Sequence, residues 1–269
     1  MSASTTPDDI TLGAYLIERL REVGVRHVFG VPGDYVLGLM DRIVESDVEL
    51  VGTCNELNAG YAADAYARLN GVGAACVTYA VGGFSILNAV AGAYAERVPL
   101  IVLCGGPNRS DREENRLLHH TLGDYDVQVE VFRHVTETAV ALTDPATAPA
   151  QIDEAIALCL RQRRPVFIEV PADLVAAPCP APSALEIQRR PASDPNAAAE
   201  AVAEASELLL RAERPVLLGG VEVHRFGLQS RLEALIDHTG LARRNRPDGQ
   251  VRRHGDASEL RRRVLRCAQ

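Results

Sequence analysis

Residues 74–104, AACVTYAVGGFSILNAVAGAYAERVPLIVLC, consist of two short apolar runs joined by a glycine pair and an alanine-rich segment. Apolar runs of this length, bounded by turn residues, are typical of strands buried on both faces of a sheet. We predict strands over 74–79 and 99–104, with a helix over 85–96 between them. Because parallel strands need a long crossover connection, this strand–helix–strand unit indicates a parallel sheet.

The same alternation continues on both sides of this stretch. Apolar residues at helical spacing, with Thr11 as a candidate N-cap and Gly24 as a stop, predict the first helix. The expected fold class is therefore α/β, a parallel sheet flanked by helices over residues 1–180. The other helices are expected at 37–44, 55–68 and 148–163, and the other strands at 27–29, 49–52 and 165–170.

A second unit is expected after a linker rich in Pro, Ala and Ser. The composition changes at about Pro171, and we place the linker at 181–196. Residues 197–240 read as the start of a second α/β domain. Because one helix–strand–helix cannot bury a core, we interpret this unit as an incomplete middle domain. Its helices are expected at 197–211 and 227–239, around a strand at 215–219.

The net charge of −8 hides an asymmetry between the body and the C-terminal end. The sequence contains no lysine, and residues 1–240 hold 19 Arg against 33 acidic residues (−14), whereas 241–269 hold 9 Arg against 3 (+6). An acidic body disfavours a nucleic-acid partner. For the tail we favour a truncated or out-of-frame translation, because the apolar periodicity stops abruptly and no aromatic residues alternate with the arginines. Reading frames past codon 240 that lack an apolar strand–helix pattern would contradict this hypothesis.

The sequence also bears on location and redox state. No run approaches the ~20 consecutive apolar residues that span a bilayer, and Met1–Asp9 lacks the features of a signal peptide. We therefore expect a cytoplasmic protein without a membrane partner. The six cysteines are scattered and form no CxxC pair, so we interpret them as buried, reduced thiols.

Two stretches place an acidic side chain beside a strand end or a helix start. Phe29–Asp34 (FGVPGD) follows a strand, at the edge of a parallel sheet where ligands gather, so Asp34 is expected to face the crevice. In Cys54–Arg68 (CNELNAGYAADAYAR), Glu56 stands at the start of a helix lined with small residues. Taken alone, Glu56 is explained as an acid that complements the helix dipole.

Two further stretches argue against a nucleotide phosphate site and a metal site. Thr78–Ser85 reads as a strand, a glycine turn and a helix, but it lacks the GxGxxG and Walker patterns, so a nucleotide phosphate site is not supported. His119 and His120 stand side by side in a loop, where paired histidines are commonly exposed or cap a helix. A metal site is disfavoured because no third ligand lies at a useful spacing.

Taken together and in order, these stretches resemble one family. VPGDY, CNELNAGYAADAYAR, the VGGFS…NAVAGAYAERVPLI block and HHTLGD are similar to the pyruvate and indolepyruvate decarboxylases, which are thiamine-diphosphate enzymes acting on 2-keto acids. The resemblance runs from about Thr11 to Val170 and continues weakly to about Gly240. It implies the pyrimidine-binding domain of the thiamine-diphosphate-binding fold and a part in non-oxidative 2-keto acid decarboxylation.

The resemblance assigns roles to individual residues. Glu56 matches the glutamate that hydrogen-bonds the aminopyrimidine ring of the cofactor. Asp34, His119 and His120 match residues that transfer protons around the keto acid substrate. Four further residues match positions that line the pyrimidine pocket: Pro32, Gly33, Thr78 and Ser85.

One part of the family pattern is missing. In the family, a GDG motif and a later NN pair bind Mg²⁺ and the diphosphate, and neither occurs in these 269 residues. The resemblance therefore implies contact with thiamine diphosphate at its pyrimidine end only, with the Mg²⁺ ligands absent from this sequence. The expected partner is a second copy in a homo-oligomer or a complementary diphosphate-binding half. We expect the chain alone to be inactive.

Alternatives to this interpretation differ in class. The chain could be a non-catalytic pairing module or a remnant that binds full-length or separately encoded subunits through its small-residue helices. An acetolactate-synthase-like carboligase is disfavoured by the His119–His120 pair. The choice between pyruvate and another 2-keto acid is not determined by these residues.

Overall fold

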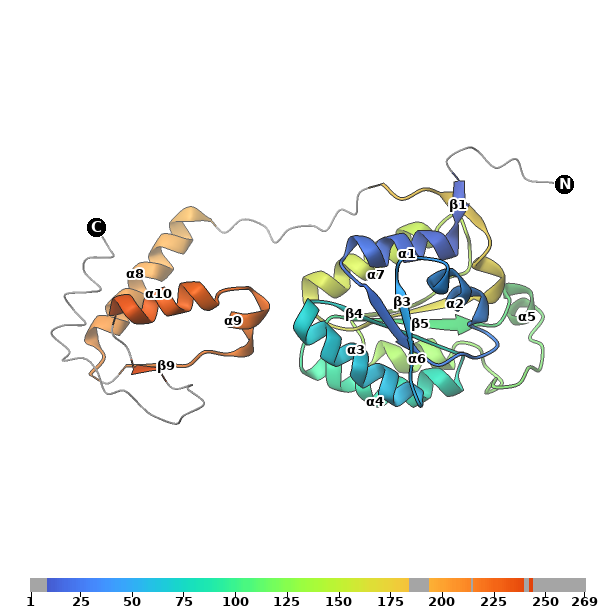
Figure 1. Cartoon of the computed structure of the whole chain (residues 1–269), viewed down its shortest axis with the longest axis horizontal. Coiled ribbons are helices and arrows are strands. Elements are labelled where there is room, and N and C mark those ends of the chain that lie inside the picture. Colours follow the sequence, from blue (N-terminus) through green and yellow to red (C-terminus); the bar gives the residue numbers. More distant parts are fainter. Residues whose placement is uncertain (1–8, 184–193, 214, 240–241, 244–269) are drawn as a thin grey trace. The chain divides into compact units, whose positions relative to one another are not determined.

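The computed structural model describes residues 9–183, 194–213, 215–239 and 242–243. The chain divides into two compact units, Met1–Arg190 and Pro191–Gln269 (Figure 1). The boundary lies in the segment predicted as a linker, of which 184–193 are outside the described residues. The finer division of the chain stays a prediction.

The first unit is built on one six-stranded sheet whose strand order is β3-β2-β4-β5-β7-β6. Every neighbouring pair in this sheet is parallel, so the predicted α/β class with a parallel sheet is confirmed. The chain runs outward from β2 in one direction and from β4 in the other, which makes the β2–β4 boundary the switch point where α/β proteins bind ligands. The strands are β2 His27–Gly30, β3 Glu49–Gly52, β4 Gly73–Val77, β5 Leu100–Gly106, β6 Thr138–Ala141 and β7 Val166–Pro171.

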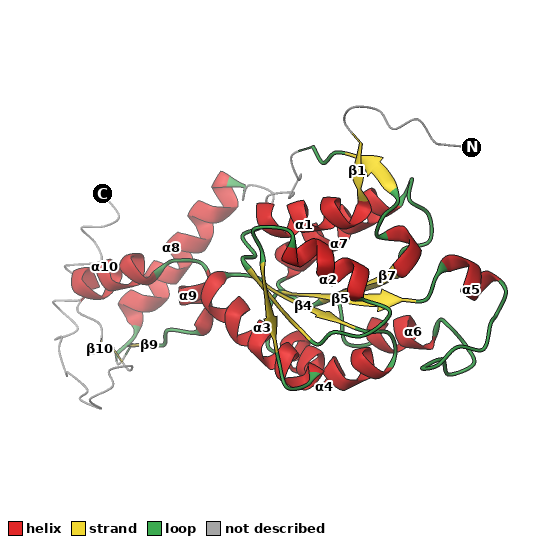
Figure 2. Ribbon diagram, turned by 45° about the vertical axis from the view of Figure 1, so that its right-hand side comes forward, coloured by secondary structure: helices red, strands yellow, loops and turns green. Residues whose placement is uncertain are grey.

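Helices cover both faces of this sheet (Figure 2). On one face, α1 (Leu12–Glu22), α2 (Leu37–Val44) and α7 (Ala148–Gln162) bury their apolar stripes in the larger core. On the other, α3 (Glu56–Asn70), α4 (Val81–Ala95) and α6 (Val127–Arg133) pack around a second core.

Small residues and local caps explain how the elements nearest the site pack and begin. A Cβ at Gly60 on α3 would lie 2.6 Å from the Cβ of Ala89 on α4, so these two helices touch almost backbone to backbone. Thr11 caps α1 as predicted, with its Oγ1 accepting a hydrogen bond from the Ala14 amide at 3.2 Å. The Asn55 side chain caps α3 in the same way, through the Asn58 amide at 2.9 Å.

Several elements differ from the sequence prediction. Helix α4 begins at Val81 rather than at Ser85, so the glycine pair lies in the first turn of the helix and not in a preceding turn. The two glycines are needed for close packing there. The polar stretch after β5 contains elements that were not predicted: α5 (Arg109–Glu113), α6 and β6. Strand β1 (Asp9–Thr11) pairs antiparallel with β8 (Pro178–Pro180), which follows the short helix η1 (Ala172–Leu174).

The second unit contains a small parallel sheet. Strand β9 (Val216–Leu217) pairs with β10 (Ala242–Arg243), which lies in the segment predicted as an Arg-rich tail. Residues 244–269 are outside the described residues, so the interpretation of the tail stays a prediction. The helices of this unit are α8 (Pro195–Arg211), α9 (Val221–Arg225) and α10 (Gln229–Thr239).

Two global expectations can be compared with the structure. Of the five described cysteines, Cys54 is exposed and the other four are buried, so the expectation of burial holds except at Cys54. Burial raises the pKa of the Cys76 thiol to about 12, which keeps it protonated and unreactive. Among the described residues, no helix has the length and apolarity needed to cross a membrane.

Candidate active site

The parallel sheet gathers the predicted site residues at one edge. Asp34 follows β2, Glu56 follows β3 and Thr78 follows β4, while His119 and His120 lie in the long connection after β5. Because these four strands are neighbours in a parallel sheet, their carboxyl ends open onto the same side. The residues therefore meet at the switch point, although up to 86 positions separate them in the sequence.

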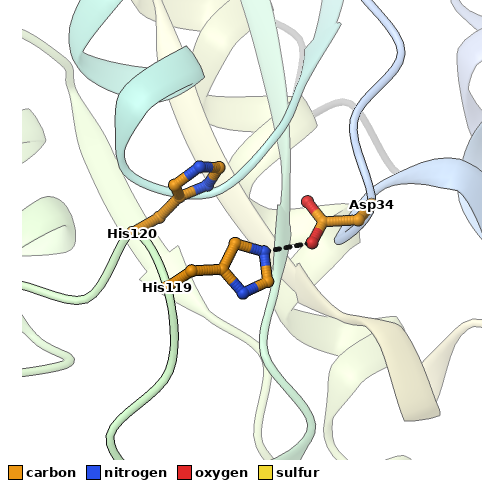
Figure 3. A group of neighbouring side chains, drawn as sticks. All are labelled: Asp34, His119 and His120. Atoms are coloured by element: carbon orange, nitrogen blue, oxygen red, sulfur yellow. Dashed lines mark hydrogen bonds and ion pairs between the residues drawn. The ribbon is translucent and has the colours of Figure 1, made fainter.

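Asp34, His119 and His120 form the first cluster of the site (Figure 3). The Nε2 atom of His119 is hydrogen-bonded to Oδ2 of Asp34, and the two side chains are 59% and 50% exposed. The two imidazole rings are 4.7 Å apart between centroids. One ligand atom from each of the three side chains lies within 4.8 Å of the others, so the three polar groups face one another.

Tyr35 supports the histidine pair. Its ring stacks on that of His119 at 5.0 Å, and its hydroxyl donates to the His119 carbonyl oxygen at 3.1 Å. Burial, followed by the negative charge of Asp34, raises the pKa of the Tyr35 hydroxyl, so it remains a donor. His120 has a φ of +68°, a left-handed conformation that is uncommon outside glycine, and its Nδ1 is buried without a partner among the described residues.

Glu56, Thr78 and two glycines form a second, adjoining cluster. A Cβ at Gly33 would lie 2.5 Å from Cβ of Thr78, and a Cβ at Gly82 would lie 3.1 Å from Cγ2 of Thr78 and 3.4 Å from Oε1 of Glu56. Only glycine fits at Gly33, where the turn after β2 packs against Thr78 at the end of β4. Thr78 is 6% exposed, and its Oγ1 has no hydrogen-bond partner within the described part of the chain. A buried hydroxyl without a partner is costly, so the close packing at this position needs an explanation.

The predicted pocket residues differ in how close the structure brings them to one another, and their place in a pocket stays a prediction. Gly33 and Thr78 touch, and Glu56 reaches the same spot from α3. Pro32 is exposed on the β2 turn, and Ser85 is half-buried in α4; their place in the pocket stays a prediction. From sequence spacing alone, we found no third metal ligand beside the two histidines. The fold brings Asp34 to them, so that a third candidate ligand is present. The absence of a metal at this cluster also stays a prediction.

A buried polar group beneath these clusters was missed by the sequence reasoning. Glu169 on β7 is 1% exposed and accepts hydrogen bonds from Arg112 and Gln128, both at 2.8 Å. Burial raises the pKa of the Glu169 carboxyl to about 7, against the lowering effect of the Arg112 charge and of both hydrogen bonds. Its signal in the sequence was an acid inside the apolar strand VFIEV, since such residues are almost never buried without a partner.

The chain is similar in sequence to known proteins. Residues 10–131 match the family described as "Thiamine pyrophosphate enzyme, N-terminal TPP binding domain". The chain is 42% identical over 264 residues to a protein named Pyruvate decarboxylase 2 from Arabidopsis thaliana, covering 94% of this chain and 43% of that protein.

Two further relatives give the same result. The chain is 43% identical over 246 residues to Pyruvate decarboxylase 2 of Oryza sativa subsp. japonica (89% of this chain, 41% of that protein). It is 40% identical over 237 residues to a probable pyruvate decarboxylase of Schizosaccharomyces pombe (87% and 42%). The chain therefore spans about two fifths of the length of the curated relatives it matches.

Proposed function

Because residues 10–131 of this chain belong to the thiamine pyrophosphate enzymes as their N-terminal TPP-binding domain, we propose that the chain supplies the aminopyrimidine side of a 2-keto acid decarboxylase active site. The observation that carries this proposal is the meeting of two clusters at one sheet edge: Asp34 with His119 and His120, and Glu56 with Thr78. The reaction is the non-oxidative decarboxylation of pyruvate or a similar 2-keto acid.

The residues present fit the pyrimidine end of thiamine diphosphate. Gly33 and Gly82 pack closely against Thr78, and this contact fixes the Thr78 side chain beside Glu56. Glu56 would hold the ring through its carboxyl group. When bound, the cofactor stabilises the negative charge left by the departing CO₂. The sequence contains no GDG or NN pair, so this chain does not fit Mg²⁺ or the diphosphate, and no step is assigned to the metal.

Asp34 and His119 are suited to hold and move a proton. With Nε2 protonated, the His119 ring donates to the Asp34 carboxylate, which fixes the tautomer of the ring. Nδ1 of His119 then faces the Tyr35 hydroxyl at 3.4 Å. His120 adds a second imidazole whose Nδ1 is unpartnered among the described residues, so the pair offers two positions for a proton near the substrate.

The remainder of the active site would come from a partner. We propose that a complementary diphosphate-binding half supplies the Mg²⁺ and diphosphate ligands, because a second copy of this sequence would lack them as well. Exposed apolar side chains on α3 and at the start of α4 favour such pairing: Tyr61, Leu69 and Val81 are 49%, 77% and 51% exposed. The same observation favours the alternative, a non-catalytic pairing module, which would keep the partner but not the cofactor contact.

Saturation-transfer NMR with thiamine diphosphate separates these two functions. We expect saturation of the protein methyl groups to reach the pyrimidine protons of the cofactor more strongly than the thiazolium methyl group, with weak affinity. Glu56→Gln should abolish the transfer. Glu130→Gln is the matched control, because Glu130 also lies in the first turn of a helix, α6, and so changes the same helix-dipole interaction. Transfer that survives Glu56→Gln, or none to the wild-type chain, would favour the pairing module.

A further inference from the structure

A chain of hydrogen bonds centred on buried side chains links the segments that carry the two clusters of the site. Its centre is Glu169 on β7, whose Oε2 accepts from Gln128 Nε2 and whose Oε1 accepts from Arg112 Nη2, both at 2.8 Å. Glu169 and Gln128 are each 1% exposed, and Arg112 is 25% exposed. The two oxygen atoms of the Glu169 carboxyl group therefore accept one hydrogen bond each, from Gln128 and from Arg112.

One arm of this chain reaches the pocket beside Glu56. Oε1 of Gln128 accepts from the Ala80 amide at 2.6 Å, and a Cβ at Gly83 would lie 2.3 Å from the same oxygen. Ala80 has a φ of +50° at the N-terminus of α4, a strained conformation for a residue with a Cβ. Because Ala80 stands between Thr78 and Gly82, its conformation determines where those two residues lie relative to Glu56.

The other arm reaches the loop that carries the histidines. The Arg112 guanidinium donates to the Tyr125 carbonyl oxygen at 3.3 Å and forms an ion pair with Asp126. Arg112 precedes the loop, and Tyr125–Asp126 end it. The Arg112 side chain therefore connects the two ends of the loop. The Tyr79 hydroxyl donates to the same carbonyl oxygen at 3.3 Å, which links the loop end back to β4.

We propose that Arg112, Glu169 and Gln128 form a positioning network. The network fixes the position of the loop that carries His119 and His120 relative to the start of α4. This role deepens the proposed function, on which it rests: the network would align the proton-transfer cluster with the cofactor pocket. None of the three residues is assigned contact with cofactor or substrate. They are positioning residues that act through Ala80 and through Tyr125–Asp126.

Donor and acceptor matching gives a decisive variant set. In Glu169→Gln, a side-chain amide replaces one acceptor by a donor, so either Arg112 or Gln128 faces another donor. The reciprocal double variant Gln128→Glu with Glu169→Gln restores the match. In it, the carboxylate introduced on α6 accepts from Ala80 and from the amide introduced on β7, while the oxygen of that amide accepts from Arg112. If Glu169 only filled space, exchanging the Glu and Gln side chains between positions 169 and 128 would not restore the wild-type behaviour.

The first measurement is amide hydrogen exchange in the full chain, without ligand. In Glu169→Gln we expect the Ala80 amide to exchange about tenfold faster, the effect of losing one buried hydrogen bond, while the amides of β5 keep their wild-type rates. The double variant should return Ala80 towards wild type. Unchanged exchange at Ala80, uniform acceleration of all amides, or absence of rescue would each overturn the proposal.

A second variant guards against a failure of Glu169→Gln to fold. Arg112→Gln keeps a side-chain donor towards Glu169, and we expect it to weaken the NMR contact between the Tyr35 and His119 rings, which stack at 5.0 Å, in a protein that remains folded. A ring contact of unchanged strength would contradict the role of Arg112.

The cofactor readout distinguishes this inference from the proposed function. Glu169→Gln should raise the dissociation constant of thiamine diphosphate about fivefold, a modest coupling, and the double variant should restore it. If the wild-type chain transfers no saturation to thiamine diphosphate, the proposed function fails. The exchange and ring measurements use no ligand, so they still decide whether the network positions these two segments.

Discussion

The carboxylate of Asp34 and the imidazole of His119 are hydrogen-bonded, although 85 positions separate them in the chain. Asp34 comes from the turn after β2 and His119 from the loop after β5, and β4 lies between these two strands in the sheet. Two segments cross the end of β4 to make this contact. Such an arrangement has a structural consequence, because moving either residue removes the hydrogen-bond partner that orients the other.

The first prediction concerns proton transfer. We expect Asp34→Asn to lower pyruvate decarboxylation by about 10²-fold or more, the range of general acid–base contributions, when the chain is paired with the part of the Arabidopsis protein that it does not match. The measurement is CO₂ release by a complex verified by size-exclusion chromatography. Asp124→Asn, in the same loop region and exposed, is the control and should retain activity. Equal rates for the two variants would contradict a role for Asp34.

The second prediction concerns the close approach of Gly33 to Thr78. Gly33→Ala should destabilise the fold by about 1–3 kcal/mol, the usual cost of overpacking, because the new Cβ would lie 2.5 Å from that of Thr78. Gly38→Ala, on α2 with open space around the position, should be neutral or stabilising. Urea denaturation of both variants provides the measurement. A Gly33→Ala protein as stable as Gly38→Ala would show that the two segments do not touch.

The third prediction concerns pH. In the unfolded chain Glu169 titrates near its ordinary pKa of 4.5, whereas burial raises the pKa to about 7 in the fold. The folded state therefore binds this proton more tightly, so the contribution of Glu169 to stability is full below about pH 4.5 and is lost as the pH rises through about 7. Between about pH 5 and pH 8, the wild type should lose about 2–3 kcal/mol more of its unfolding free energy than Glu169→Gln.

Urea denaturation of the two proteins across this pH range is the corresponding measurement. The other titrating groups contribute equally to both proteins, so they cancel in the comparison. Parallel stability curves for wild type and Glu169→Gln would show that Glu169 does not titrate in this window.

The fourth prediction concerns the ion pair between α1 and α7. Arg19 is 1% exposed and forms two hydrogen bonds of 2.6 Å with Asp153. Asp153→Ala should cost about 3 kcal/mol, at the lower end for a broken buried pair, because Glu22 still bonds the guanidinium at 2.7 Å. Glu18→Ala breaks an exposed pair with Arg21 and should cost about 0.5 kcal/mol or less. Thermal or urea unfolding that ranks the two variants equally would contradict this account.

The sheet could be predicted from the sequence because its central strands are continuous apolar runs. Strands β4, β5 and β7 are buried on both faces, and residues 74–79, 99–104 and 165–170 carry no turn residue inside them. Strand β6 was missed because it lies at the sheet edge and is half-buried, so TAVA gives neither a long run nor an alternation. The start of α4 was misplaced because a glycine pair was interpreted as a turn, whereas the glycines serve close contacts with Thr78 and Gln128.

The site was predicted from motifs and not from geometry. The order of the four motifs pointed to Glu56, Asp34, His119 and His120, and parallel strands explain why they share one edge. The roles of Gln128 and Arg112 could not be predicted in this way. Each depends on a partner that is distant in sequence, and the burial of a polar side chain cannot be recognised from the sequence alone. Glu169 alone gave a local signal, as an acid within an apolar strand.

We infer that Glu56 and its surroundings hold the pyrimidine end of thiamine diphosphate. Saturation-transfer NMR on the wild type, Glu56→Gln and Glu130→Gln is the decisive measurement, because it needs neither a partner nor turnover. We expect transfer to the pyrimidine protons in the wild type and Glu130→Gln, and none in Glu56→Gln. Equal transfer in all three proteins, or stronger transfer to the thiazolium methyl group than to the pyrimidine, would contradict it.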